Sequence, residues 1–97
     1  MKRIELERTI RHMIREYWIY FSKNGYMNSD GRKLLALLAK QAKNVDIHVS
    51  RMLWRLLKDP SIDNLVKLAK EIGVNIEDDL ATALYGPYSW RFRSRSP

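Results

Sequence analysis

The order of helix starts and stops between residues 38 and 72 constrains the fold of this chain more than any other feature. Apolar residues recur there at spacings of three and four, which is typical of amphipathic helices that bury one face. Asp46 and Ser61 each precede such a run and are good N-terminal caps. Pro60 ends the run between them, because the residue before a proline avoids helical geometry. The stretch therefore predicts short helices joined by tight turns.

The same helical pattern continues on both sides of this stretch. Asn24-Gly25 is a natural stop for the first helix, since both residue types tolerate left-handed backbone. We expect Ser29 or Asp30 to cap the second helix, Asn75 to cap the last, and Gly73 to end the fourth. The expected helices cover residues 5–22, 31–43, 47–58, 62–72 and 76–85.

The apolar positions of these helices predict the core. The first helix is richer in aromatic residues than one packing face needs. Core packing is the main interpretation of this surplus, and a contact with a second subunit is the alternative. The aromatic residues are Tyr17, Trp18, Tyr20 and Phe21. The other inward positions are Leu6, Ile10, Met13 and Ile14 in the first helix, Val49, Met52, Leu53 and Leu56 in the third, and Ile62, Leu65, Leu68, Ala69 and Ile72 in the fourth.

Length and composition exclude several classes of protein. The 97 residues are enough for one core, and we expect one domain over residues 1–86 followed by a tail over 87–97. With no cysteine and two histidines, disulfides and zinc sites are not expected, and no cofactor is predicted. No catalytic motif is present, so we expect no enzyme. Glu77, Asp78 and Asp79 are interpreted as compensation of a helix dipole.

The distribution of charge predicts a polyanionic partner. The net charge is +7, and residues 1–58 carry 13 lysines and arginines against 5 acidic residues. Residues 59–79 reverse this balance, with 2 basic residues against 6 acidic ones. A basic front and an acidic middle suit a polyanion on one face. A surface kept soluble by excess basic residues explains the composition equally well. Charges are spread along the first 21 residues, which therefore lack the uninterrupted apolar run of a signal peptide or a membrane span, and we expect a cytoplasmic protein.

Two segments resemble a known family. LAKQAKNVDIHVSRML is similar to the helix-turn-helix of the lambda-repressor/Cro-type (XRE) family, and PSIDNLVKLAKEIGVNIEDDL resembles the segment that follows it. Lys43-Asn44 replaces the usual glycine of the turn, and the segment before Pro60 is one residue longer. The resemblance implies an all-α, five-helix lambda-repressor-like helix-turn-helix domain with an extended N-terminal helix and a short extended C-terminal tail. It also implies a prokaryotic or viral, repressor-like transcription regulator.

In such a fold a recognition helix, here about residues 46–58, enters the DNA major groove. Arginine can bond both acceptors of guanine, and an apolar side chain can meet the thymine methyl group. The second helix crosses the phosphate backbone, so nearby cations add affinity without sequence information. The expected base contacts are Ile47, His48, Ser50, Arg51 and Arg55, and the expected phosphate contacts are Arg32, Lys33, Lys40, Lys43 and Lys58. We expect Trp54 to pack against the first helix or a partner subunit.

The tail has two interpretations. Its aromatic and basic residues alternate, which fits either a DNA-binding arm or an edge strand that pairs with a second subunit. These residues are Trp90, Arg91, Phe92, Arg93 and Arg95. A module of this size has little contact area, so a homodimer on a pseudo-palindromic, double-stranded operator is expected. The alternatives are a protein-binding module, such as an antitoxin-like partner or an inhibitor of another regulator, and non-specific nucleoid-style binding.

Overall fold

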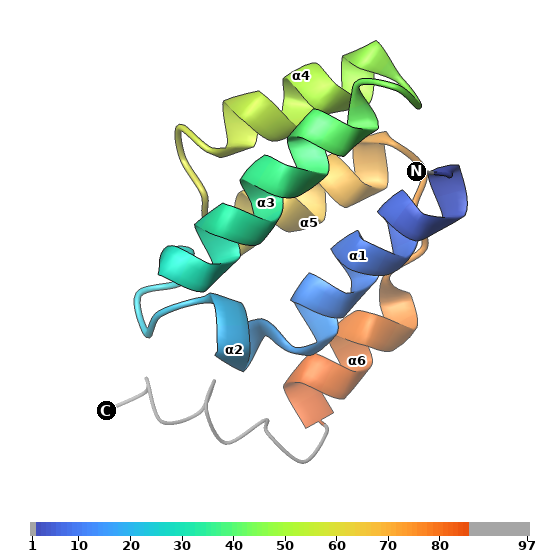
Figure 1. Ribbon diagram of the computed structural model, residues 1–97. Coiled ribbons are helices and arrows are strands. Elements are labelled where there is room, and N and C mark those ends of the chain that lie inside the picture. Colours follow the sequence, from blue (N-terminus) through green and yellow to red (C-terminus); the bar gives the residue numbers. More distant parts are fainter. Residues whose placement is uncertain (1, 86–97) are drawn as a thin grey trace.

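The computed structural model of the chain describes residues 2–85, and its regular elements there are helices (Figure 1). Beyond them, the described residues form only two isolated β-bridges, which join Phe21 to Met27 and Tyr26 to Ser61. The prediction of an all-α fold is therefore confirmed. The helices are α1 (Arg3–Arg15), α2 (Tyr17–Tyr20), α3 (Ser29–Ala42), α4 (Ile47–Leu56), α5 (Ile62–Glu71) and α6 (Glu77–Tyr85).

The first expected helix is divided in two, so the single helix over residues 5–22 is a wrong prediction. The backbone leaves helical geometry at Glu16, where φ is −104° and ψ is 39°. The indole Nε1 of Trp18 donates to the Glu16 carboxylate at 2.9 Å across this break. The break directs the single turn of α2 toward α3, against which it packs. Apolar spacing alone did not indicate the division, because the apolar pattern continues through it.

Most of the predicted helix boundaries are confirmed by hydrogen bonds. The Asp46 carboxylate accepts from the amides of His48 and Val49 at 2.9 and 3.4 Å, which caps α4. The Ser61 hydroxyl accepts from the Asn64 amide at 3.2 Å at the start of α5. The side chain of Asn75 accepts from the Glu77 amide at 3.1 Å. Gly73 has a φ of +80°, the left-handed geometry expected of a helix stop.

The cap of α3 differs from the prediction. Helix α3 begins at Ser29, two residues earlier than expected, so neither Ser29 nor Asp30 can cap it. Instead the Asn28 side chain accepts from the amide of Gly31 at 2.9 Å. Its amide group also donates to the carbonyl of Ile19 at 2.7 Å, which ties the start of α3 to α2. A single asparagine thus caps one helix and fixes it to the preceding one.

The loop before α3 is bound to the connection between α4 and α5. The Met27 amide donates to the carbonyl of Pro60, and the Ile62 amide donates to the carbonyl of Gly25, both at 2.8 Å. These bonds hold two chain segments together that lie more than thirty positions apart in sequence. They give the loop backbone the hydrogen-bond partners that a buried segment needs.

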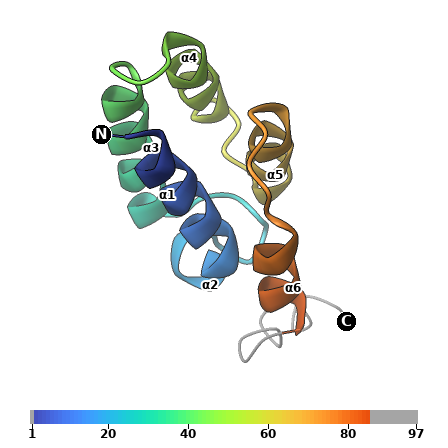
Figure 2. The same cartoon turned by 90° about the vertical axis from the view of Figure 1, so that its right-hand side faces the viewer.

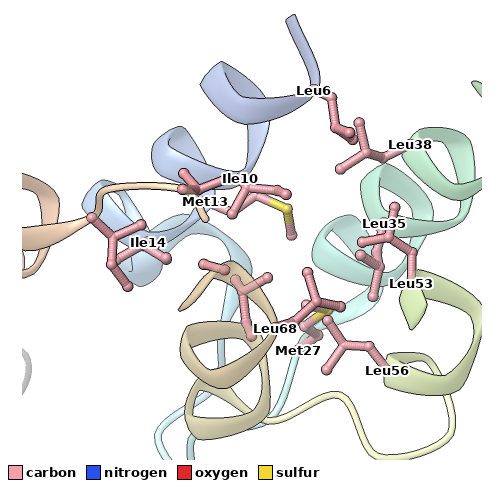
Figure 3. Packing of buried hydrophobic residues seen from close by; sticks show 14 of the residues in the cluster. Leu6, Ile10, Met13, Ile14, Met27, Leu35, Leu38, Leu53, Leu56 and Leu68 are labelled. Carbon is pink, nitrogen blue, oxygen red and sulfur yellow. The ribbon is translucent and has the colours of Figure 1, made fainter. Parts of the chain in front are cut away.

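The core collects side chains from every long helix, as Figure 3 shows for α1, α3, α4 and α5. All four aromatic residues of the first expected helix belong to it or pack against it: Tyr17 and Phe21 are buried, and Trp18 and Tyr20 are partly buried. Core packing therefore accounts for the aromatic surplus. Side chains drawn from α1, α3, α4 and α5 include Leu6, Ile10, Met13, Leu35, Leu38, Leu53, Leu56 and Leu68.

Candidate nucleic-acid interface

Helices α3 and α4 pack against each other and are joined by the short turn over residues 43–46. A buried hydrogen bond fixes their relation: the Ser50 hydroxyl donates to the carbonyl of Ala39 at 2.7 Å. Ser50 is 3% exposed, so the expectation that it contacts bases is wrong. Its position on α4 faces α3, and its hydroxyl is used to hold the two helices together. Val49, Leu53 and Leu56 are buried on the same side of α4.

The opposite side of α4 is an exposed arc, which we call the α4 arc. At 100° per residue its members fall next to one another around the helix axis, away from Val49 and Leu53. Four of the five predicted base-contacting residues lie on it, together with Trp54 and, just past the helix end, Lys58. The exposed residues of the α4 arc are Ile47, His48, Arg51, Trp54, Arg55 and Lys58. The structure thus brings Ile47, His48, Arg51 and Arg55 together on one surface.

The start of α4 is also held from a distant part of the chain. A guanidinium nitrogen of Arg3 donates to the carbonyl of Ile72 at 2.7 Å, and another lies 3.8 Å from the Asp46 carboxylate. Arg3 therefore links the beginning of α1 to the end of α5 and to the cap of α4. Sequence reasoning missed this residue, because no local spacing relates positions so far apart.

The predicted phosphate-contacting cations of the α3 region are all exposed and lie on two faces. Lys33 and Lys40 are seven positions apart and share one face of α3. Arg32 and Lys43 are eleven positions apart, close to three turns, and share another face on the side of Ala39, where α4 packs. Arg32 and Lys43 are therefore the better placed of the four to act together with the α4 arc.

Two apolar side chains interrupt the charge of the α4 arc. Trp54 is 42% exposed and Ile47 is 43% exposed. Trp54 does not belong to the core or to the partly buried residues packed on it, so packing against the first helix is not seen, and the alternative, a contact with a partner subunit, stays a prediction. The arc therefore combines an indole and an aliphatic side chain with two guanidinium groups, an imidazole and, just past the helix end, the ammonium group of Lys58.

A second polar cluster joins α1 to α6. Asp79 has no exposed surface, and its carboxylate accepts from Arg11 at 2.8 Å and from Arg15 at 2.7 and 3.1 Å. The interpretation of Asp79 as dipole compensation is therefore incomplete, because its main partners are two arginines of α1. Its spacing from Ile76 and Ala83, which are also buried, carried the signal that Asp79 points inward. The hydrogen bond with Asp79, and then its charge, raise the pKa of Arg11 above its ordinary value.

Tyr20 and His12 form a contact beside this cluster. The Tyr20 hydroxyl lies 2.8 Å from the Nε2 atom of His12, and the two rings meet edge to face. Burial raises the pKa of Tyr20, and the nearby carboxylates of Glu16 and Asp30 raise it further. The phenol therefore stays neutral at physiological pH. Its hydroxyl forms a hydrogen bond with the imidazole, in which the tautomer of His12 decides which group donates.

Other classes of site are not formed by the described residues. Within residues 2–85, no group of three or more histidine and acidic side chains is placed to hold a metal ion. No helix of this part of the chain has the length and apolar character needed to cross a membrane. The predicted arm or dimer strand lies outside the described residues, and with it Trp90, Arg91, Phe92, Arg93 and Arg95.

Comparisons with known proteins give no match to a protein-family model, to a curated protein or to a solved structure. The resemblance to the XRE family stays a prediction from the two segments that carry it.

Proposed function

We propose that the protein is a sequence-specific, double-stranded DNA-binding transcription regulator, repressor-like in action, in which α3 and α4 form a helix-turn-helix. The observation that carries this proposal is the α4 arc. Arg51 and Arg55 stand on one exposed surface of a helix whose other side is fixed by the core and by the Ser50 bond. A helix held in this way can enter a major groove without losing its orientation.

The chemistry of the α4 arc fits base edges. Each guanidinium can donate to both the O6 and N7 acceptors of a guanine. Ile47 can contact the methyl group of a thymine, and His48 can donate to a base or a phosphate. Arg32, Lys33, Lys40, Lys43 and Lys58 would neutralise phosphates on either side and make the affinity depend on salt.

A single copy offers little surface for tight binding, because one recognition helix contacts only a few base pairs. A homodimer that reads two half-sites would multiply these contacts, and two-fold symmetry would then require a pseudo-palindromic operator. The protein would act in the cytoplasm, on the nucleoid of its host.

Selection of bound sequences from a random pool of duplexes tests this proposal. We expect enrichment of one sequence with guanines at fixed positions, arranged as two half-sites about one helical turn apart. Recovery of sequences without any common pattern, together with a steep dependence on salt, would instead indicate non-specific binding driven by charge.

The exposed Trp54 and Ile47 favour a second candidate function, a protein-binding module on the same scaffold. Aromatic anchors surrounded by polar residues are typical of protein interfaces. In that case the parent protein would capture its protein partner and would bind no duplex above the non-specific level. Trp54→Ala would abolish capture of the partner. Sequence-specific DNA binding by the parent protein would refute this candidate function.

A further inference from the structure

A second basic surface lies on α1, away from the α4 arc. Arg8, Arg11, His12 and Arg15 line a hollow of about 310 Å³. Their spacing of three, four and seven positions puts all four on one face of the helix. Helix α1 packs beside α6 here, and Figures 1 and 2 place α4 and α6 at opposite ends of the bundle. We call this surface the α1 hollow.

Asp79 holds two guanidinium groups of the α1 hollow in fixed positions. Its buried carboxylate accepts from Nε of Arg11 and from Nε and Nη2 of Arg15. Both arginine side chains nevertheless stay 40–45% exposed. A guanidinium has five N–H donors, so the bonds to Asp79 use one donor of Arg11 and two of Arg15. The other donors remain at the surface, on groups whose orientation is already set.

The charge of the α1 hollow stays positive after this pairing. Three arginines face one buried carboxylate, and Arg8 lies one turn before the paired residues, where it is exposed. The other acidic group of the same helix that acts on Arg11, Glu7, is itself 3.3 Å from Arg3. Asp78 of α6 also acts on Arg11 but is exposed to water, which weakens its effect. Glu5, three positions before Arg8, is a further exposed acidic neighbour on this face, so three guanidinium groups stand against the buried Asp79 and the two exposed carboxylates of Glu5 and Asp78.

The length of the row indicates which anion it suits. From Arg8 to Arg15 the helix rises by about 10 Å, which is longer than one carboxylate or one phosphate. Guanidinium groups match the oxygens of phosphates with paired hydrogen bonds. A row of such groups fits several phosphates in sequence, as in a nucleic-acid backbone.

We propose that Arg8, Arg11 and Arg15 form a phosphate-binding surface that takes the backbone of a second duplex while the α4 arc holds the first. This inference rests on the proposed DNA-binding function, because bridging requires the α4 arc to hold the first duplex while the α1 hollow, on the part of α1 that packs beside α6, takes the second. The protein would then bridge two DNA segments.

Bridging is measured by energy transfer between two duplexes of the selected sequence, one with a donor dye and one with an acceptor. Arg8→Glu is the test variant. The bonds to Asp79 come from Arg11 and Arg15, so replacing Arg8 leaves these links between α1 and α6 intact. Lys70→Glu on α5 is the matched control, with the same change of charge at an exposed position. We expect Arg8→Glu to reduce bridging tenfold or more and to change single-duplex affinity about as little as Lys70→Glu does. Equal bridging by Arg8→Glu and Lys70→Glu would overturn the proposal.

A second experiment titrates the protein with inorganic tripolyphosphate and follows its binding through the NMR signals of the arginine side chains. Shifts of Arg8, Arg11 and Arg15 that disappear in Arg8→Glu would support the phosphate site. Such shifts without any bridging would show that a free polyphosphate is the ligand, which overturns the role of a second duplex. If the parent protein binds no duplex at all, the proposed function fails, whereas the tripolyphosphate titration still decides whether the phosphate site exists.

Discussion

Replacing the buried Asp79 by asparagine should destabilise the protein strongly, although the two side chains have nearly the same size. The carboxylate is fully buried and accepts three hydrogen bonds from Arg11 and Arg15. Removing one partner of a fully buried ion pair costs about 3–5 kcal/mol. Here the arginines are 40–45% exposed and can turn to water, which lowers the cost. We therefore expect Asp79→Asn to lose about 1.5–3 kcal/mol of the free energy of unfolding, close to the value of hydrogen bonds to a charged group.

Asp78→Asn is the matched control, since Asp78 is the preceding residue on α6 and is exposed. It should change the free energy of unfolding by no more than about 0.5 kcal/mol. Urea unfolding followed by circular dichroism at 222 nm measures both variants. Thermal unfolding should show a midpoint lower by roughly 6–24 °C for Asp79→Asn, since each kcal/mol shifts the midpoint of a domain of this size by about 4–8 °C. Equal stability of the two variants would refute the role given to the Asp79 cluster.

Two further substitutions test the packing by the same unfolding measurement. Gly31→Ala should destabilise by about 1–3 kcal/mol although alanine favours helices, because its Cβ atom would collide with the backbone carbonyl of Tyr20; a gain in stability would show that α2 and α3 are not packed so closely. Leu53→Ala should cost about 2–5 kcal/mol, because the side chain is fully buried, whereas Leu37→Ala, at a position 51% exposed, should cost far less; similar losses would contradict the orientation of α3 and α4.

The helices could be predicted from the sequence where a local signal marks them. Asp46 and Ser61 could be predicted as caps because each directly precedes an apolar run. Asn75, two residues before α6, accepts from the first amide of that helix, and Gly73 could be predicted to follow the end of α5 because it tolerates left-handed backbone. The inward face of α4 also follows from its spacing. These features depend on neighbours within a few residues, which is the range that a single sequence describes well.

Features that depend on distant neighbours were not predicted. The break at Glu16 lies inside a continuous apolar pattern, and Asn28, which caps α3, also bonds the carbonyl of Ile19 in α2. The candidate site shows the same limit. The exposed arginines of α4 follow from helical spacing, but Ser50 was misassigned because its hydroxyl reaches the carbonyl of Ala39 on another helix. Arg3 and Asp79 act over more than sixty positions, so only the folded chain reveals their partners.

The central proposal is that the α4 arc reads DNA sequence, and a titration of the selected duplex at fixed salt tests it most directly. The Arg51→Ala/Arg55→Ala protein is compared with Lys67→Ala/Lys70→Ala, which removes the same charge from exposed positions of α5. Loss of each guanine contact should cost about 1–3 kcal/mol, which is about 5- to 150-fold in affinity, and should relax sequence preference. The control should lose little affinity and keep its preference. Equal losses in the two proteins, with sequence preference unchanged, would contradict the assignment of α4 as the recognition helix.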